Sequence, residues 1–238
     1  MAVRDPLGPD VPRHPLSRRD AAQAFLGHDF ANPSLLTEAL THRSAAGAKG
    51  VGSNERLEFI GDRVLGLIVA EWLIERFPAE QEGKLGPRLA ALVSKPSLAA
   101  IAQTHRVADM LSVAPGEARR GVSSQATVLA DALEAMIGAL YLDAGLEAAR
   151  AFVRRVMAKV VDAQNAPPKD PKTALQEWAL KRALPLPHYQ VVAQSGPSHA
   201  PLFVIRVSVG EASAEASAGA KRAAEQEAAR QLLGVLPE

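Results

Sequence analysis

The sequence NERLEFIGDRVLGL, residues 54–67, has an apolar side and an acidic side when it is placed on a helix. At about 100° per residue, one side collects the apolar residues of a normal core stripe: Leu57, Ile60, Val64, Leu67 and the following Ile68. The opposite sector carries Glu55, Glu58 and Asp62, and no lysine or arginine lies on it. It is flanked by two large apolar residues, Phe59 and Leu65.

Three carboxylates on one sector repel each other unless a cation lies among them. A face that only meets water normally mixes charges of both signs and is seldom edged by phenylalanine and leucine. The stretch therefore predicts one half of a metal site. A solvated acidic face is the alternative, and this stretch alone does not decide between the two.

A second acidic pair lies on the apolar segment ATVLADALEAMIGALYL, residues 126–142. Its only charges are Asp131 and Glu134, which are three residues apart and so share a helix face. No lysine or arginine occurs from Gly121 to Ala149, so the carboxylates need a raised pKa, a distant arginine or a metal ion. Two helices that each present carboxylates at helical spacing favour a hard, oxygen-binding cation such as Mg²⁺ or Mn²⁺.

These residues carry a family resemblance. NERLEFIGDRVL resembles the signature of the ribonuclease III family, and two further blocks resemble its other conserved segments: ALTHRS (39–44) and LADALEAMIGALYLD (129–143). The resemblance extends from about Ala21 to the C-terminus, in the family's order and spacing. Nine consecutive matching residues are far more specific than a lone glycine motif.

The resemblance implies a site and an activity. Its metal ligands would be Glu58, Asp62, Asp131 and Glu134, with Asp62 and Glu134 as catalytic residues. Two secondary acids, Glu55 and Glu82, would shape a cleft formed with the other subunit of a homodimer. The implied enzyme is an Mg²⁺-dependent endoribonuclease, in which Mn²⁺ can substitute. It would cut double-stranded RNA to 5′-phosphate and 3′-hydroxyl ends with short 3′ overhangs, and process ribosomal-RNA precursors, messenger RNA and other structured RNAs.

Composition sets outer bounds on the chain. It has 238 residues, of which 47% are hydrophobic and only 4% aromatic, so a sizeable core must consist mainly of alanine, leucine and valine. It contains no cysteine, which fits a reducing compartment, and the resemblance implies the cytoplasm. The formal net charge of +1 gives no sign of nucleic-acid binding, so any such surface must be local.

The first 17 residues are expected to form a disordered tail, since they contain four prolines and lack the apolar run of a signal peptide. No stretch is apolar for long enough to cross a membrane. An all-α endonuclease domain is predicted over 18–162, with helices at 18–26, 33–41, 54–77, 96–104, 126–142 and 146–162. The segments 45–53 and 114–124 are predicted to be loops, and Arg119 and Arg120 of the second could face solvent or phosphate.

A proline-containing linker is predicted over 163–170. The pattern then changes to helix 173–183, strands 188–194, 202–209 and 211–218, and helix 219–233. This small α+β layout, α-β-β-β-α over 171–236, resembles a double-stranded RNA-binding domain. Such domains read duplex RNA by its shape, through minor-groove 2′-hydroxyls and phosphates.

Three places in this part match that mode of binding. Thr173 and Gln176 share a helix face that could reach one minor groove, and the turn GPSH (196–199), with His199, could enter the next. Lys221 and Arg222 begin the last helix, where cations oppose the dipole unless a phosphate is bound. The family often has serine and a further basic residue where this chain has Ala220 and Ala223. We therefore expect weaker RNA affinity and a shallower salt dependence than a fuller basic cluster gives.

Two other functions remain as alternatives. A non-catalytic duplex-RNA binder would be expected to have lost some of the four carboxylates, and all four are present. A di-iron carboxylate protein needs Glu-x-x-His pairs, and the sequence has none. Among neighbouring polar residues, Asn54 is expected to cap its helix and His42 to pack or form hydrogen bonds rather than act in catalysis.

Overall fold

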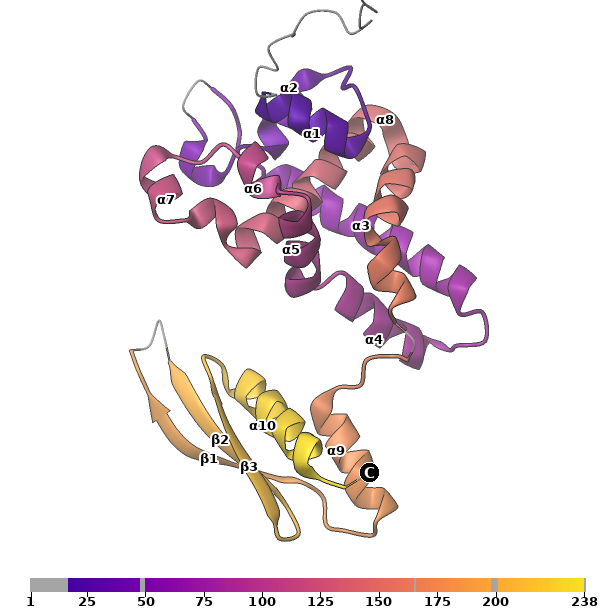
Figure 1. The fold of residues 1–238 in the computed structure, drawn as a ribbon, viewed down its shortest axis with the longest axis vertical. Helices are drawn as coiled ribbons and strands as arrows, with labels where there is room; N and C mark the ends of the chain where they lie inside the picture. The colour runs from indigo at the N-terminus through magenta and orange to yellow at the C-terminus, as the bar shows by residue number, and fades with distance from the viewer. Residues whose placement is uncertain (1–16, 48–49, 165, 198–200, 238) are drawn as a thin grey trace, which may run out of the picture. The chain divides into compact units, whose positions relative to one another are not determined.

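The structure, a computed structural model, describes residues 17–47, 50–164, 166–197 and 201–237 and divides into two compact units after Ala166 (Figure 1). The expected N-terminal tail lies outside these residues except for Ser17. The turn residue His199 lies outside them as well. The boundaries of the linker at 163–170 stay a prediction.

The first unit is helical, as predicted. Its longer predicted helices are α1 (Arg18–Leu26), α2 (Pro33–Ala39), α3 (Glu55–Arg76), α5 (Lys95–Thr104) and α8 (Ala126–Asp162). A further long helix, α4 (Glu82–Leu92), was not among the predicted ones. Cap residues explain where several begin: the Asn32 side chain accepts a hydrogen bond from the Ser34 backbone N–H, and Pro33 follows at the first helical position. No helix in the described part of the chain is long and apolar enough to cross a bilayer.

The second predicted loop contains more structure than expected, because it includes α7 (Pro115–Arg119) and η2 (Val122–Ser124). The described part of the first loop has no helix beyond Ala45, the last residue of a short 3₁₀ helix, η1 (Arg43–Ala45). A further short helix, α6 (Val107–Met110), lies just before the second loop. Pro115 explains α7, because its ring is compatible with the first turn of a helix. Arg119 and Arg120 are exposed, and Arg120 pairs with Glu117 at 3.3 Å.

Helices α3 and α8 form the centre of this unit and cross with their backbones in close contact. Gly61 of α3 lies against the carbonyl of Glu134, and Gly138 of α8 lies against the carbonyl of Leu57. A side chain at either position would collide with the other helix, so the two glycines make this close crossing possible. Gly145 has a φ of 79° and breaks α8, as predicted from the separate helical segments on either side of it.

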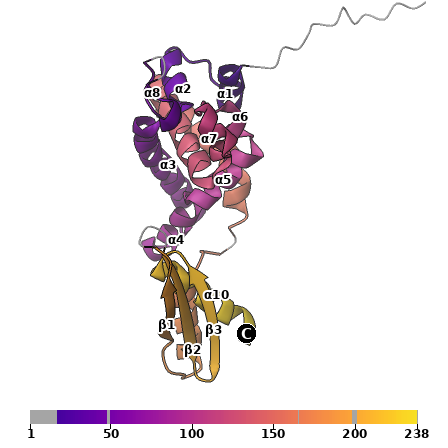
Figure 2. The same ribbon diagram turned by 90° about the vertical axis from the view of Figure 1, so that its left-hand side faces the viewer.

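The second unit consists of α9 (Pro171–Lys181), strands β1 (His188–Ser195), β2 (Leu202–Val209) and β3 (Ala212–Ala218), and α10 (Lys221–Val235). The antiparallel sheet has the order β1-β2-β3, and α10 packs on one of its faces (Figures 1 and 2). Its core contains Leu175 from α9, Val207 from β2 and the inward face of α10: Ala224, Ala228 and Leu232. The predicted α-β-β-β-α order is confirmed.

Candidate active site

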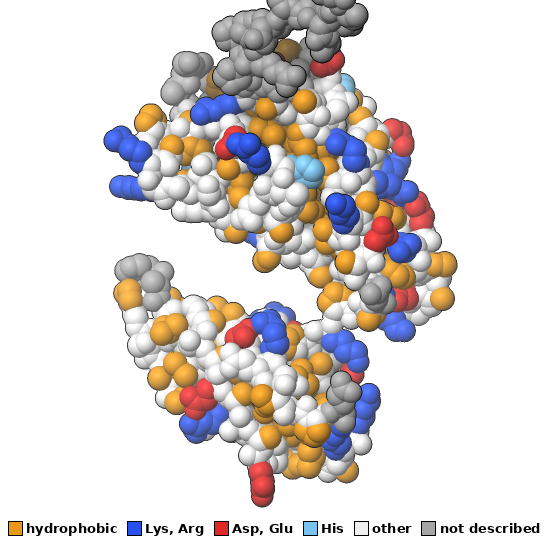
Figure 3. Space-filling model, in the orientation of Figure 1, with side chains coloured by type: hydrophobic (Ala, Val, Ile, Leu, Met, Phe, Trp, Pro, Cys, Tyr) orange, Lys and Arg blue, Asp and Glu red, His pale blue; other side chains and the backbone are white. Residues whose placement is uncertain are grey.

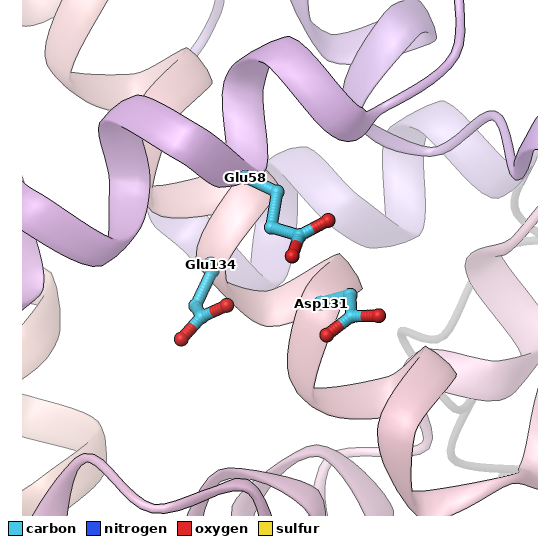
Figure 4. Close-up of side chains that lie close together, drawn as sticks. All are labelled: Glu58, Asp131 and Glu134. Carbon is cyan, nitrogen blue, oxygen red and sulfur yellow. The ribbon is translucent and has the colours of Figure 1, made fainter.

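Three carboxylates converge where α3 and α8 cross. Glu58 of α3 and Asp131 and Glu134 of α8 each offer an oxygen atom, and these oxygens all lie within 4.8 Å of one another. Figure 4 shows the three side chains close together, one from α3 and two from α8. The spacing follows from the helix: Asp131 and Glu134 are three residues apart on α8, and the glycine contact brings Glu58 beside them.

Asp62, the fourth predicted ligand, is not part of this cluster. It lies one turn after Glu58 on α3, its side chain is 46% exposed, and it pairs with the neighbouring Arg63. It still lines one hollow together with Glu58 and Glu134. The structure therefore brings three of the four predicted ligands together and leaves the fourth at the edge of the same hollow.

The electrostatics of the cluster are those of a site short of positive charge. Burial raises the pKa of Glu134 to about 7, and repulsion from the neighbouring carboxylates adds to the shift. The residue is only 6% exposed. Burial also raises the pKa of Glu58, and repulsion from Asp131 raises it further. Bringing these groups together in their ionised form is therefore unfavourable until a cation balances them.

One cation near the cluster was missed from the sequence. Lys95, the first residue of α5, places its Nζ atom 2.8 Å from Oδ1 of Asp131. A distant cation was one of the three choices left open from the sequence, as an arginine, and the structure supplies a lysine instead. A lysine at a helix start opposes the dipole, and that signal, which was applied to Lys221, could have identified Lys95.

Two hollows border the cluster. The first is lined by Glu58 and Asp131 together with His42, Asn54 and the first turn of α8. The second contains Glu58, Asp62 and Glu134 beside Phe59 and Lys95. Glu55, a predicted secondary acid, lines both hollows and accepts a hydrogen bond from Ser53 at 2.7 Å. The two hollows share Glu55 and Glu58, so the recessed surface beside the carboxylates extends over both.

The other polar residues singled out from the sequence are placed differently. Asn54 occupies the position before α3, but its side chain makes no capping hydrogen bond, so that expectation was only half right. Nδ1 of His42 lies 2.8 Å from Oγ of Ser44. Glu82 begins α4, is exposed and contributes no oxygen to the three-carboxylate cluster.

The two apolar residues that flank the acidic sector have opposite environments. Leu65 is fully buried within the chain, whereas Phe59 is 63% exposed and is covered in part by the Arg63 guanidinium, 4.4 Å from its ring centroid. Leu67 is exposed, so its predicted place on the core stripe was wrong, and Ile74 is exposed as well; both lie within about 80° of Phe59 around α3. Helix α3 therefore has an exposed apolar stripe that begins beside the acidic cluster.

In the second unit, four of the five predicted RNA contacts line a single hollow between α9 and α10: Thr173, Gln176, Lys221 and Arg222. Helix α10 has no side-chain cap and no acidic residue in its first turn, which leaves its N-terminus suited to an anion. Lys172 lies in the same hollow but pairs with Glu225 at 2.5 Å. On the face drawn in Figure 3, basic and acidic side chains are mixed, in line with the net charge of +1.

Two family models match the chain. The model described as Ribonuclease-III-like matches residues 32–160, and the double-stranded RNA binding motif matches residues 171–236. Both matches fall on the units where the carboxylate cluster and the α9–α10 hollow lie.

Curated relatives match along most of the chain. It is 50% identical to ribonuclease 3 of Dinoroseobacter shibae over 210 residues, which cover 87% of this chain and 91% of that protein. It is 45% identical to ribonuclease 3 of Azorhizobium caulinodans, over 92% of this chain and 95% of that protein.

Among solved structures, the nuclease domain of ribonuclease III from Campylobacter jejuni matches with a TM-score of 0.56 and 38% identity. That match covers 59% of this chain and 96% of the domain, which has a flexible region involved in dimer formation.

Proposed function

We propose the details of an activity whose family is known: this chain belongs to the ribonuclease III family and is an endoribonuclease that acts on double-stranded RNA. The proposed enzyme depends on Mg²⁺ and releases 5′-phosphate and 3′-hydroxyl ends with short 3′ overhangs. The observation that supports this most is the convergence of Glu58, Asp131 and Glu134 from two helices. Its expected substrates are ribosomal-RNA precursors, messenger RNA and other structured RNAs, and its expected place is the cytoplasm.

The donor set fits a hard divalent cation. All three groups offer carboxylate oxygens, which Mg²⁺ and Mn²⁺ prefer. Oxygens bound to one octahedral Mg²⁺ at 2.0–2.1 Å are about 2.9 Å apart when adjacent and about 4.2 Å apart when opposite. The carboxylate oxygens lie within 4.8 Å of one another, so the side chains would draw closer together round a bound ion. Glu58, Asp131 and Glu134 would hold the ion, and Asp62 would complete or orient the set from the edge of the hollow.

The reaction forms one bond and breaks another. The oxygen of a water molecule bonds to phosphorus, the bond from phosphorus to O3′ breaks, and O3′ leaves with a proton as the 3′-hydroxyl. A bound divalent ion supplies a more acidic water and neutralises charge on the phosphoryl oxygens. The buried position of Glu134 between two helices holds its carboxylate in one place while the RNA binds. The hollows beside the cluster leave room for the strand being cut.

Product analysis tests this function. A long RNA duplex would be incubated with the full chain in Mg²⁺, in Mn²⁺ and in EDTA, with single-stranded RNA of the same sequence as the control substrate. We expect cleavage of the duplex in both metals and none in EDTA. The 5′ ends should become labelled by kinase only after phosphatase treatment, and the 3′ ends should accept ligation directly. Cleavage in EDTA, or 3′-phosphate ends, would show that the proposed chemistry is wrong.

The exposed stripe on α3 supports a homodimer in which two sites cut the two strands. An apolar surface of this kind, on a helix that also carries Glu58, is typical of a protein interface. Replacing Phe59 by serine should weaken self-association by about 10-fold to 100-fold, since buried aromatic anchors dominate interfaces. Sedimentation velocity across a concentration series measures this directly. Leu180→Asp, at an exposed leucine of α9, is the control and should leave the sedimentation unchanged. A monomeric wild type would rule out the dimer.

Lys221 and Arg222 at the start of α10 are expected to contact phosphates. Alanine at either position should weaken duplex binding similarly for all sequences and reduce the slope of log affinity against log salt by about 1. Filter binding or fluorescence anisotropy in Ca²⁺ at several salt concentrations gives both values. Arg230→Ala, an exposed residue of the same helix paired with Glu227, is the matched control. A wild-type slope as steep as that of a strongly basic domain would contradict the expectation drawn from Ala220 and Ala223.

A further inference from the structure

Lys95 occupies a position that is unfavourable for a lysine unless a negatively charged partner binds its ammonium group. It is the first residue of α5, where the helix dipole opposes a positive charge. Its backbone is held there by the Ser94 cap, which accepts a hydrogen bond from the Ser97 N–H, and by Pro96 at the second position. The local sequence thus places an ammonium group at a helix end for which an acidic or neutral residue would serve better.

The ammonium compensates by pairing with Asp131 at 2.8 Å. In the described part of the chain, no other lysine or arginine forms an ion pair with Glu58, Asp131 or Glu134. With all three carboxylates ionised, the cluster carries three negative charges and Lys95 neutralises one. Lys95 also holds Oδ1 of Asp131, one of the carboxylates that would bind a divalent ion.

The lysine side chain is 54% exposed, in contrast to the buried Glu134, so little packing holds it in place. It lines the same hollow as Asp62, Phe59 and Glu134. A flexible four-carbon stem with three rotatable donors can exchange one oxygen partner for another without moving the backbone. A phosphate that enters this hollow would lie within reach of the ammonium group once Asp131 no longer holds it.

We infer that Lys95 is a movable counter-ion of the active site. Its ammonium group holds Asp131 while no metal is bound, gives up that carboxylate when a divalent cation binds, and then contacts a non-bridging oxygen of the scissile phosphate. This inference rests on the proposed function. It assigns Lys95 two separable effects: competition with the metal in the free enzyme, and stabilisation of the transition state in the complex with RNA.

The test uses the full chain with Lys95→Met, which keeps most of the stem and removes the charge, and Lys95→Arg, which keeps the charge. Lys159→Met, at an exposed lysine in the last turn of α8, is the matched control. Mn²⁺ affinity of the RNA-free protein is measured by isothermal titration calorimetry. Cleavage of a long duplex is measured under single-turnover conditions at saturating Mg²⁺, and thermal melting confirms that each variant is folded.

Lys95→Met should bind Mn²⁺ about 3-fold to 10-fold more tightly, because a competing charge has been removed. It should also cleave about 10-fold to 100-fold more slowly at saturating metal, with duplex affinity in Ca²⁺ within about 2-fold of wild type. Lys95→Arg should recover most of the rate, and Lys159→Met should match the wild type. A residue that merely supported the fold would weaken metal binding and cleavage together.

Weaker or unchanged Mn²⁺ binding by Lys95→Met would overturn the role of Lys95 as a competing counter-ion. Tighter Mn²⁺ binding with wild-type cleavage would overturn the phosphate contact. If the wild type itself fails to cut duplex RNA, the proposed function fails, and the Mn²⁺ titration still decides whether Lys95 competes for the cluster.

Discussion

Glu134→Gln is expected to abolish cleavage of duplex RNA while the protein still binds it. Glutamine has the size of glutamate but lacks its charge, so the cluster loses one of its three ionised oxygen donors without a change in packing. Loss of a metal ligand should lower the single-turnover rate by about 1000-fold or more. Binding should be retained because the predicted RNA contacts on α9 and α10 belong to the other unit.

The same substitution should stabilise the metal-free protein at alkaline pH. The pKa of Glu134 is about 7 in the folded state against an ordinary value of 4.5. When the pKa of a carboxyl group is higher in the folded state than in the unfolded state, its ionisation destabilises the fold. For Glu134 this cost is complete above pH 7 and disappears as the pH falls from 7 to 4.5. At pH 8 in EDTA, Glu134→Gln should therefore unfold at a higher temperature than wild type, by roughly 3–6 °C for a gain of about 1–2 kcal/mol. The difference should vanish near pH 4.5.

Three measurements on one variant test these expectations: cleavage in Mg²⁺, duplex binding in Ca²⁺, and melting in EDTA at pH 8 and pH 4.5. Glu147→Gln, an exposed residue of the same helix, is the control and should behave as wild type in the cleavage and binding assays. Cleavage by Glu134→Gln within about 10-fold of wild type would exclude Glu134 as an essential ligand. If wild type and variant both bind and neither cuts, the chain is better described as a non-catalytic duplex-RNA-binding protein.

Local signals in the sequence were sufficient to predict most of the fold. Periodicity and caps are properties of neighbouring residues, so the segment beginning at Asn32 and Pro33 predicted α2 directly. The change from helical spacing to alternating and β-branched runs from His188 onward predicted strands β1 and β2, and the predicted third strand is β3. The short helix α7 was missed because one proline within a loop rich in glycine and serine gives little periodicity.

The parts of the site that were missed depend on contacts across the chain. Lys95 and Asp131 are 36 residues apart, and no pattern within either segment indicates their ion pair. Phe59 and Leu65 looked alike on a helical projection, yet only the packing of the surrounding helices shows that Leu65 is covered and Phe59 is not. Asp62 contributes no oxygen to the three-carboxylate cluster and pairs with Arg63, and helix geometry alone shows neither.

Gly61→Ala should be among the most destabilising single substitutions in the nuclease unit. A Cβ atom at Gly61 would lie 1.8 Å from the carbonyl oxygen of Glu134 and 3.0 Å from the backbone nitrogen of Gly138. Carbon and carbonyl oxygen normally approach no closer than about 3.3 Å, so α3 and α8 would have to separate by about 1.5 Å at their crossing. Both partners are backbone atoms of a buried helix, which cannot rotate away as a side chain can. We expect a loss of about 3 kcal/mol or more in the free energy of unfolding.

The same separation should impair the active site, because the crossing that Gly61 permits is what brings Glu58 to Glu134. A displacement of about 1 Å at reacting groups can lower a rate by about 100-fold, so any folded Gly61→Ala protein should cleave poorly even well below its melting temperature. Gly83→Ala, at an exposed glycine of α4, is the control. Nothing lies within 4 Å of its Cβ position, so alanine there should stabilise α4 by about 0.5–1 kcal/mol through its higher helix propensity. Denaturant unfolding of both variants measures the contrast, and equal stability of the two would show that the helices do not cross this closely.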